Sequence, residues 1–345
     1  MIDLSLPLWG NILVFLGTAL AIGMAGVKMA GYADELADRT GLGEAITGMV
    51  MLGLITALPG IAASVTAAVE GHPGIAISNA MGGIAVQTVA LAAADLFYRK
   101  ANLEHAAASV ENLLQTILLI LLMSLVLMAI AGPDVTLWHV HPMTLLLFAA
   151  AGFAIRIVYQ TRERPMWKPT ATSETVKDVP DESSSGKSLR QLVLGLLITG
   201  AITTTSGSLA AEAAEGLLEQ TDLTASVVGG LFLAIVTSLP ELVTSIGSVR
   251  RGAVTLAVSG VVGGNFFDVL FVSAADLFYR PGSLFHAREI GNQEVFVTTL
   301  AIVLNGVLLS GLLYRQRRGP ANIGFEGLLM ILLYALGFLI LWAGV

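Results

Sequence analysis

The sequence predicts an all-α integral membrane protein whose ten transmembrane helices form two inverted five-helix repeats. Apolar runs of about 20 residues recur along the chain, and each is long enough to cross the hydrocarbon core as a helix. Charged residues make up only 12% of the chain, and its mean hydropathy is +0.80. The same residue patterns also return at a constant offset of 181 residues. A large soluble helical bundle would need far more polar helix faces, so we exclude that class.

Ten apolar runs account for the predicted helices. They cover about 9–30, 45–69, 73–93, 112–131, 143–160, 190–211, 225–249, 253–277, 294–314 and 324–343. The chain contains 0 cysteines, which excludes a disulfide framework and a thiolate metal site.

The constant offset indicates an internal duplication, a common construction of secondary transporters. Thr56-Ala57-Leu58-Pro59-Gly60 returns as Thr237-Ser238-Leu239-Pro240-Glu241, and the block 94–99 returns as 275–280. Gly82-Gly83 likewise returns as Gly263-Gly264. The copies differ in chemistry, because the first has Gly60 where the second has Glu241.

The distribution of lysine and arginine predicts the orientation. Ten crossings place alternate loops on opposite sides, and one side holds only Arg280 and Arg288. The positive-inside rule makes the other, cation-rich side cytoplasmic, so we expect both termini outside. The cytoplasmic set is Lys28, Arg39, Arg99, Lys100, Arg162, Arg164, Lys168, Lys177, Lys187, Arg190, Arg250, Arg251, Arg315, Arg317 and Arg318.

This topology divides the chain into three parts. We expect one five-helix half at 1–160, a flexible cytoplasmic linker at 161–189 and the second, inverted half at 190–345. The linker is polar and rich in proline and serine, which is typical of a flexible connection. Its shortness and the compact chain suggest a prokaryotic inner or plasma membrane.

The seventh helix contains the first polar group at mid-membrane depth: Thr237, Ser238 and Glu241. Pro240 cannot donate a backbone hydrogen bond, so it should kink the helix and free the carbonyl near Val236. Oxygen groups of this kind bind hard cations. A membrane-embedded carboxylate costs about 2.5 kcal/mol or more, so it is a functional candidate. The alternative is a glutamate in a polar contact between helices.

The eighth helix adds a second carboxylate in Gly263-Gly264-Asn265-Phe266-Phe267-Asp268. Adjacent glycines permit close helix approach or a backbone break. Asp268 could be a cation ligand, a proton carrier or a neutral hydrogen-bonded partner. Asn265 and Ser259 are further candidate ligands, with ordinary interhelical hydrogen bonding as the alternative.

The first repeat offers a poorer set of candidates. Thr56, Ser78 and Gln87 stand opposite Thr237, Ser259 and Asp268, while Ala57, Gly60 and Ile84 replace Ser238, Glu241 and Asn265. A structural role at helix ends is expected for the matched pair Asp95 and Asp276. His105 and His286 also match, but no supporting metal-ligand set surrounds them in the sequence.

These motifs resemble the sodium/calcium exchanger branch of the cation/calcium antiporter superfamily. Residues 235–241 and 263–268 are similar to the two motifs of its alpha repeats, and 74–83 looks like the equivalent stretch of the first repeat. The resemblance implies a site between helices two, three, seven and eight, and alternating access by sliding of helices one and six. It implies these cation-binding residues: Glu241, Asp268, Thr237, Ser238, Asn265, Ser259, Thr56, Ser78 and Gln87.

The implied function is secondary active antiport, with calcium exchanged for sodium or protons. The family's paired glutamates face each other across the site, whereas this chain keeps only Glu241. A monovalent cation/proton exchanger and a non-transporting binding or regulatory protein therefore stay open. We expect inorganic cations and the lipid bilayer as partners, with no cofactor and no nucleic acid. We expect no enzyme activity, because no nucleophile–base set or phosphate loop occurs.

Overall fold

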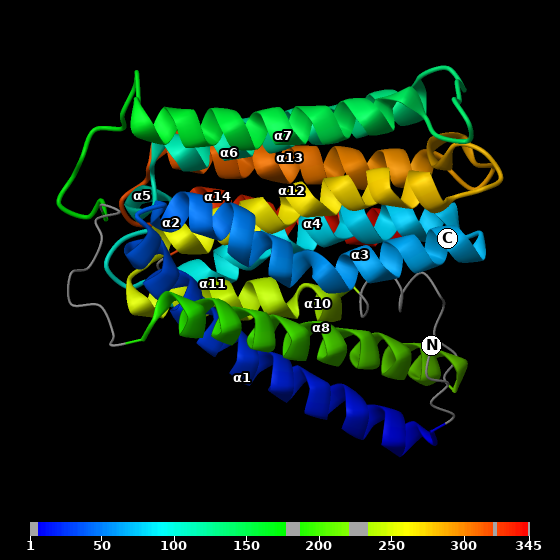
Figure 1. Ribbon diagram of the computed structural model, residues 1–345, viewed down its shortest axis with the longest axis horizontal. Coiled ribbons are helices and arrows are strands. Elements are labelled where there is room, and N and C mark those ends of the chain that lie inside the picture. The colour runs from blue at the N-terminus through cyan, green and yellow to red at the C-terminus, as the bar shows by residue number, and fades with distance from the viewer. Residues whose placement is uncertain (1–5, 177–186, 221–233, 320–322, 344–345) are drawn as a thin grey trace.

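The computed structural model describes residues 6–176, 187–220, 234–319 and 323–343. Within these ranges the chain is helical and forms no β-strand beyond the isolated bridge between Leu137 and Val140. The predicted all-α membrane fold is therefore confirmed (Figure 1).

The helices of the two halves follow the predicted runs closely. The first half contains α1 (Leu8–Thr40), α2 (Gly43–Ile46), the π-helical η1 (Thr47–Leu52), α3 (Gly53–Glu70), α4 (Pro73–Asp95), α5 (Leu103–Ala106), α6 (Val110–Ala131) and α7 (Pro142–Glu163). The second contains α8 (Leu189–Glu219), α10 (Ala234–Thr237), α11 (Leu239–Arg251), α12 (Val254–Phe278), the 3₁₀ turn η3 (Leu284–His286), α13 (Asn292–Tyr314) and α14 (Phe325–Ala343).

Nine helices in the described ranges are long and apolar enough to cross a membrane. The predicted run at 225–249 is the exception, because 221–233 lie outside the described residues. Its described part forms α10, which contacts α8, and α11, which packs against α1 and α12.

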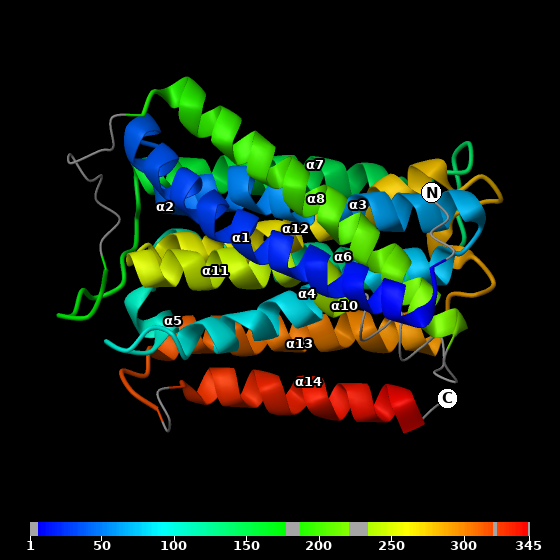
Figure 2. The ribbon, with the colours of Figure 1, turned by 90° about the horizontal axis from the view of Figure 1, so that it is seen from below.

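The two longest helices, α1 and α8, pack against each other at one side of the bundle (Figures 1 and 2). At 33 residues α1 is about 50 Å long, whereas a hydrocarbon core is about 30 Å thick, so its polar C-terminal turns extend past the apolar part at about 9–30. Leu13, Leu16 and Leu20 on its outer face are exposed, as expected of side chains that contact lipid.

The most buried of the candidate spans is α12, which packs against α3, α4, α6, α7, α11 and η1. Glycines set the closeness of its crossing with η1 and α3. A side chain on Gly263 would overlap the backbone of Met49, and one on Gly53 would overlap the backbone of Gly263 and Gly264. This contact brings the polar residues of α3 and α12 into one region.

Asp95 and Asp276 fix equivalent corners, which are the turns that follow α4 in the first half and α12 in the second. Asp95 accepts hydrogen bonds from the backbone N–H groups of Leu103, at 2.6 Å, and Gly324, at 3.2 Å. Asp276 accepts one from Leu284 N–H at 2.7 Å and one from the Thr144 hydroxyl at 2.6 Å. The expected structural role of this pair is confirmed.

The described part of the linker contacts the helical bundle. Val176 N–H donates to Ala106 O at 3.1 Å, and the Thr172 hydroxyl lies 2.8 Å from His105 Nε2. We call the end of the bundle that contains these contacts the linker end. Residues 177–186 lie outside the described residues, so the flexibility of the linker as a whole stays a prediction.

The glycine crossing generates a stability prediction. Gly263→Ala should lower the free energy of unfolding by about 1–3 kcal/mol, because its methyl group has no space beside Met49. Gly82→Ala is the matched control at the equivalent position of the first half, where the nearest side-chain atom would be 4.0 Å away. Thermal unfolding of both variants in detergent measures the difference. Equal melting temperatures would contradict the proposed packing role.

Candidate cation-binding site

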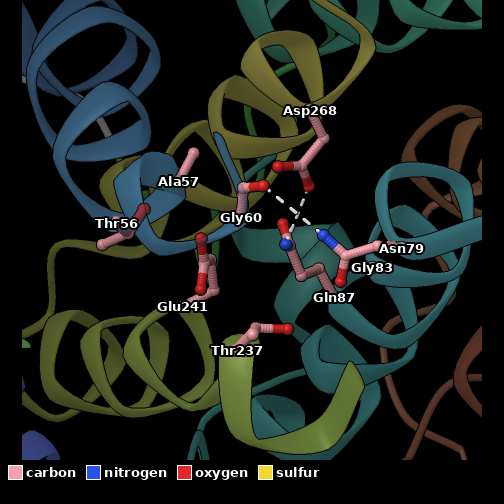
Figure 3. A pocket seen from close by; sticks show the side chains of 9 residues that line it. All are labelled: Thr56, Ala57, Gly60, Asn79, Gly83, Gln87, Thr237, Glu241 and Asp268. Carbon is pink, nitrogen blue, oxygen red and sulfur yellow. Dashed lines mark hydrogen bonds between the residues drawn. The ribbon is translucent and has the colours of Figure 1, made fainter. Parts of the chain in front are cut away.

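A small cavity lies in the interior where α3, α4, α10, α11 and α12 meet (Figure 3). Both mid-membrane carboxylates contribute to its wall, and both are buried: Glu241 is 1% exposed and Asp268 3%. The residues that line the cavity are Thr56, Ala57, Gly60, Asn79, Gly83, Gln87, Thr237, Glu241 and Asp268.

Glu241 is positioned by a break in the seventh membrane segment. Helix α10 ends at Thr237 and α11 begins at Leu239, with Pro240 in the first turn, as the proline predicts. In contrast, α3 runs unbroken through Pro59. Glu241 therefore lies in the first turn of α11, where the helix dipole favours negative charge. Neither of its carboxylate oxygens has a hydrogen-bond partner among the described residues, so both are available to a ligand.

Asp268 is held by its counterpart from the other repeat. Gln87 Nε2 donates to Asp268 Oδ2 at 2.8 Å, across the 181-residue offset (Figure 3). The oxygen of the same amide, Gln87 Oε1, is buried and accepts no hydrogen bond from the described residues. The amide thus fixes the carboxylate and presents an oxygen of its own.

Glycines make room for these polar groups. A Cβ atom at Gly60 would lie 3.5 Å from Asp268 Oδ1, so the position that lacks a carboxylate is next to the carboxylate of Asp268. On the opposite side, a Cβ at Gly264 would lie 3.3 Å from Gln87 Oε1 and 3.5 Å from Glu241 Oε1. Larger residues at either position would reach into the space between the polar groups.

Asn79 is the polar side chain of the cavity that the sequence analysis missed. Its Nδ2 donates to Ser64 Oγ at 3.1 Å and to Gly60 O at 3.4 Å. The sequence could have predicted Asn79, because residues four apart share one face of a helix and positions 79, 83 and 87 are spaced in this way along α4. Ser78 is one residue off that face.

The structure brings five of the nine predicted residues together at the cavity: Thr56, Gln87, Thr237, Glu241 and Asp268. The other four do not line it. The Ser238 hydroxyl is buried beside Thr237 at the helix break and has no hydrogen-bond partner in the described ranges.

The remaining three bond to groups elsewhere. Ser78 donates to Glu294 Oε1 at 3.4 Å, Ser259 to Glu44 O at 3.0 Å and Asn265 to Thr88 Oγ1 at 3.1 Å. Each of these three hydrogen bonds joins two helices.

Comparison with known proteins identifies the family. The sodium/calcium exchanger protein family model matches residues 10–167 and again residues 191–343, which together make up most of the chain. The chain belongs to this family. As a member it is a membrane antiporter that handles inorganic cations, and not an enzyme.

Relatives and solved structures agree with the assignment. The protein named "Putative antiporter CaxA" of Alkalimonas amylolytica is 25% identical over 88% of this chain and 91% of its own length. Inner membrane protein YrbG of Escherichia coli is 23% identical over 73% of this chain and 75% of its own. The sodium-calcium exchanger NCX_Mj, soaked with 10 mM Na+ and zero Ca2+, has the same fold, with a TM-score of 0.71 at 17% identity. That match covers 96% of this chain and 98% of the other.

The bond between Gln87 and Asp268 generates a prediction. Gln87→Leu should lower the free energy of unfolding by about 1–3 kcal/mol, because it leaves a buried carboxylate without its donor. Asp268→Asn is the matched control, since an amide oxygen can accept the same N–H. Thermal unfolding without added cations measures both variants. A loss of equal size in the control would show that the hydrogen bond is not the cause.

Proposed function

We propose that this protein is a secondary active antiporter that exchanges calcium for sodium or protons by alternating access. The observation that carries the proposal is the pair of buried carboxylates, Glu241 and Asp268, in one cavity lined by further oxygen groups. None of the described residues that line the cavity carries a positive charge.

Charge balance supports a divalent ion as the substrate. An ion stripped of its water in an apolar site needs opposite charge close by, and two carboxylates match one calcium ion. Calcium takes six to eight oxygen ligands. The open oxygens of Glu241 and Gln87 offer part of this shell, and Asp268, Thr237 and Asn79 offer more.

The glycine at position 60 favours a second candidate, a monovalent cation/proton exchanger. If Asp268 keeps a proton throughout the cycle, only Glu241 is charged, and one monovalent cation balances it. The two candidates therefore differ in the charge on Asp268, which transport experiments can separate.

The packing of α1 and α8 supports the sliding that the family resemblance implies. These helices form one layer across the bundle (Figure 2), and small residues line the contact of α1 with α11. A side chain on Gly26 would press on Val243, and one on Gly247 would meet Ala30 at 3.1 Å. We propose that the α1–α8 pair moves over this small-residue interface and exposes the cavity to alternate sides.

We also propose that the linker end faces the cytoplasm of a prokaryotic cell, with both termini outside. The distribution of lysine and arginine supports this orientation. The printed name of YrbG, an inner membrane protein, supports the choice of membrane.

Replacement of either carboxylate tests the proposal. Glu241→Gln and Asp268→Asn should each weaken calcium binding about a hundredfold or more, because each removes one of two charges from a buried ion, a loss of about 3–5 kcal/mol. Calorimetry measures binding, and flux into proteoliposomes under a sodium or proton gradient measures transport. Glu294→Gln is the control, since Glu294 is also buried but lies outside the cavity.

The outcomes separate the candidate functions. Calcium flux that either variant abolishes supports the calcium antiporter. Flux of sodium or potassium against protons, without calcium flux, supports the monovalent exchanger. A protein that binds and moves no cation would be a non-transporting member of the family, and both proposals would be wrong.

A further inference from the structure

A second pair of buried carboxyl groups lies far from the cavity, at the linker end. Glu104 belongs to α5 and Glu326 to the first turn of α14, and their exposed fractions are 1% and 0%. Figures 1 and 2 show α5 and the start of α14 at the same end of the bundle. All four carboxyl oxygens of the pair lack a hydrogen-bond donor in the part of the chain that the structure describes. A buried carboxylate without a donor is costly, so the doubly charged form of the pair is disfavoured.

Among the described residues, the surroundings supply negative charge, and no ion pair joins a cation to Glu104 or Glu326. Asp95 is close enough to repel both groups, and its own oxygens already accept from Leu103 and Gly324. The guanidinium of Arg315 donates instead to Thr170 O, His105 O and Thr175 Oγ1. Burial, followed by the charges of Asp95 and Glu326, raises the pKa of Glu104 well above its usual range.

The geometry favours a proton over a metal ion as the ligand. Calcium requires six to eight oxygens, but only two carboxyl groups are open here. In the described ranges no group of three or more histidine, aspartate or glutamate side chains is arranged to hold a metal. The carboxyl groups of Glu104 and Glu326 are within hydrogen-bonding range of each other, so a single proton on either one joins them.

The equivalent corner of the second half shows that the fold does not require an acid at this position. Phe285 stands at the offset of 181 residues from Glu104, is buried, and packs edge-on against His141 at 5.5 Å. An apolar contact therefore closes the same corner in the other repeat. The pairing of Glu104 from the first half with Glu326 from the second therefore calls for a different explanation.

We propose that Glu104 and Glu326 share one proton and form a pH-sensitive lock at the linker end, separate from the cation cavity. With the proton bound, the lock holds α5 on α14. Because α5 contacts the linker through Ala106 and His105, the lock also supports the contacts of Thr172 and Val176. Loss of the proton leaves two carboxylates face to face, and the corner opens.

Other titratable groups around the lock must be distinguished from it. Asp95 accepts from the backbone of Leu103 and Gly324 at the same corner. The ring nitrogens of His105 contact Arg315 O at 2.6 Å and Thr172 Oγ1 at 2.8 Å. The titratable and charged groups around this corner in the described ranges include Asp95, Tyr98, His105, Glu174, Arg315 and Arg317.

Hydrogen–deuterium exchange of the full-length protein in lipid nanodiscs tests the lock, from about pH 5 to about pH 9. The raised pKa of Glu104 means that the folded corner binds more protons than the opened one, so its stability falls as pH rises above about 4.3. After correction for the pH dependence of amide chemistry, exchange at residues 101–108 and 170–176 should rise by up to about tenfold per pH unit, the limit for one proton.

Three variants complete the experiment. Glu104→Gln and, independently, Glu326→Gln should remove the pH response, because the amide donates permanently to the remaining carboxylate. His105→Gln should retain the response. Wild-type exchange that does not change with pH would overturn the proposal, as would a response that survives both glutamine variants or disappears in His105→Gln. If one glutamine variant does not fold, the other decides.

Discussion

Glu241 and Asp268 lie in an apolar interior, where a carboxylate loses the hydration that water would provide. Charge of this kind must be balanced locally, and the described lining of the cavity contains no lysine or arginine to do so. Under the proposed function, a mobile cation or proton supplies this balancing charge. An exchanger needs this property, because a fixed counter-charge would hold the site in one ionic state.

The arrangement of the bundle follows from the need to place oxygen around these two groups. The break at Ser238 directs the start of α11 at the cavity and places Glu241 in its first turn. Close packing at Gly53 and Gly263 brings α3 and α12 together, so that residues from both repeats share one space. Gly60 and Gly264 keep that space free of other side chains. Packing and chemistry thus depend on the same small set of glycines.

The sequence was informative where local physics dominates. Apolar length set the membrane helices, because it does not depend on distant contacts. Proline was a weaker guide, because the seventh segment breaks beside Pro240 whereas α3 runs unbroken through Pro59. The direction in which a polar side chain faces was harder to predict. Ser78 and Asn79 are adjacent. The helical period groups Asn79 with Gly83 and Gln87, and the packing of α4 against α3 and α13 turns that face to the cavity while Ser78 bonds Glu294. Glu104 and Glu326 lie far apart in the sequence near helix ends, where a carboxylate is usually solvated. Their burial follows from tertiary structure alone.

The hydrogen bond between Gln87 and Asp268 has an evolutionary consequence. Its two partners occupy the same position in the two copies of the duplicated unit. A symmetric dimer of identical chains would have to place the same residue on both sides, either two amides or two mutually repelling acids. A donor matched to an acceptor became possible only after the two copies had diverged in sequence. Since then the halves have been complementary, and neither can substitute for the other.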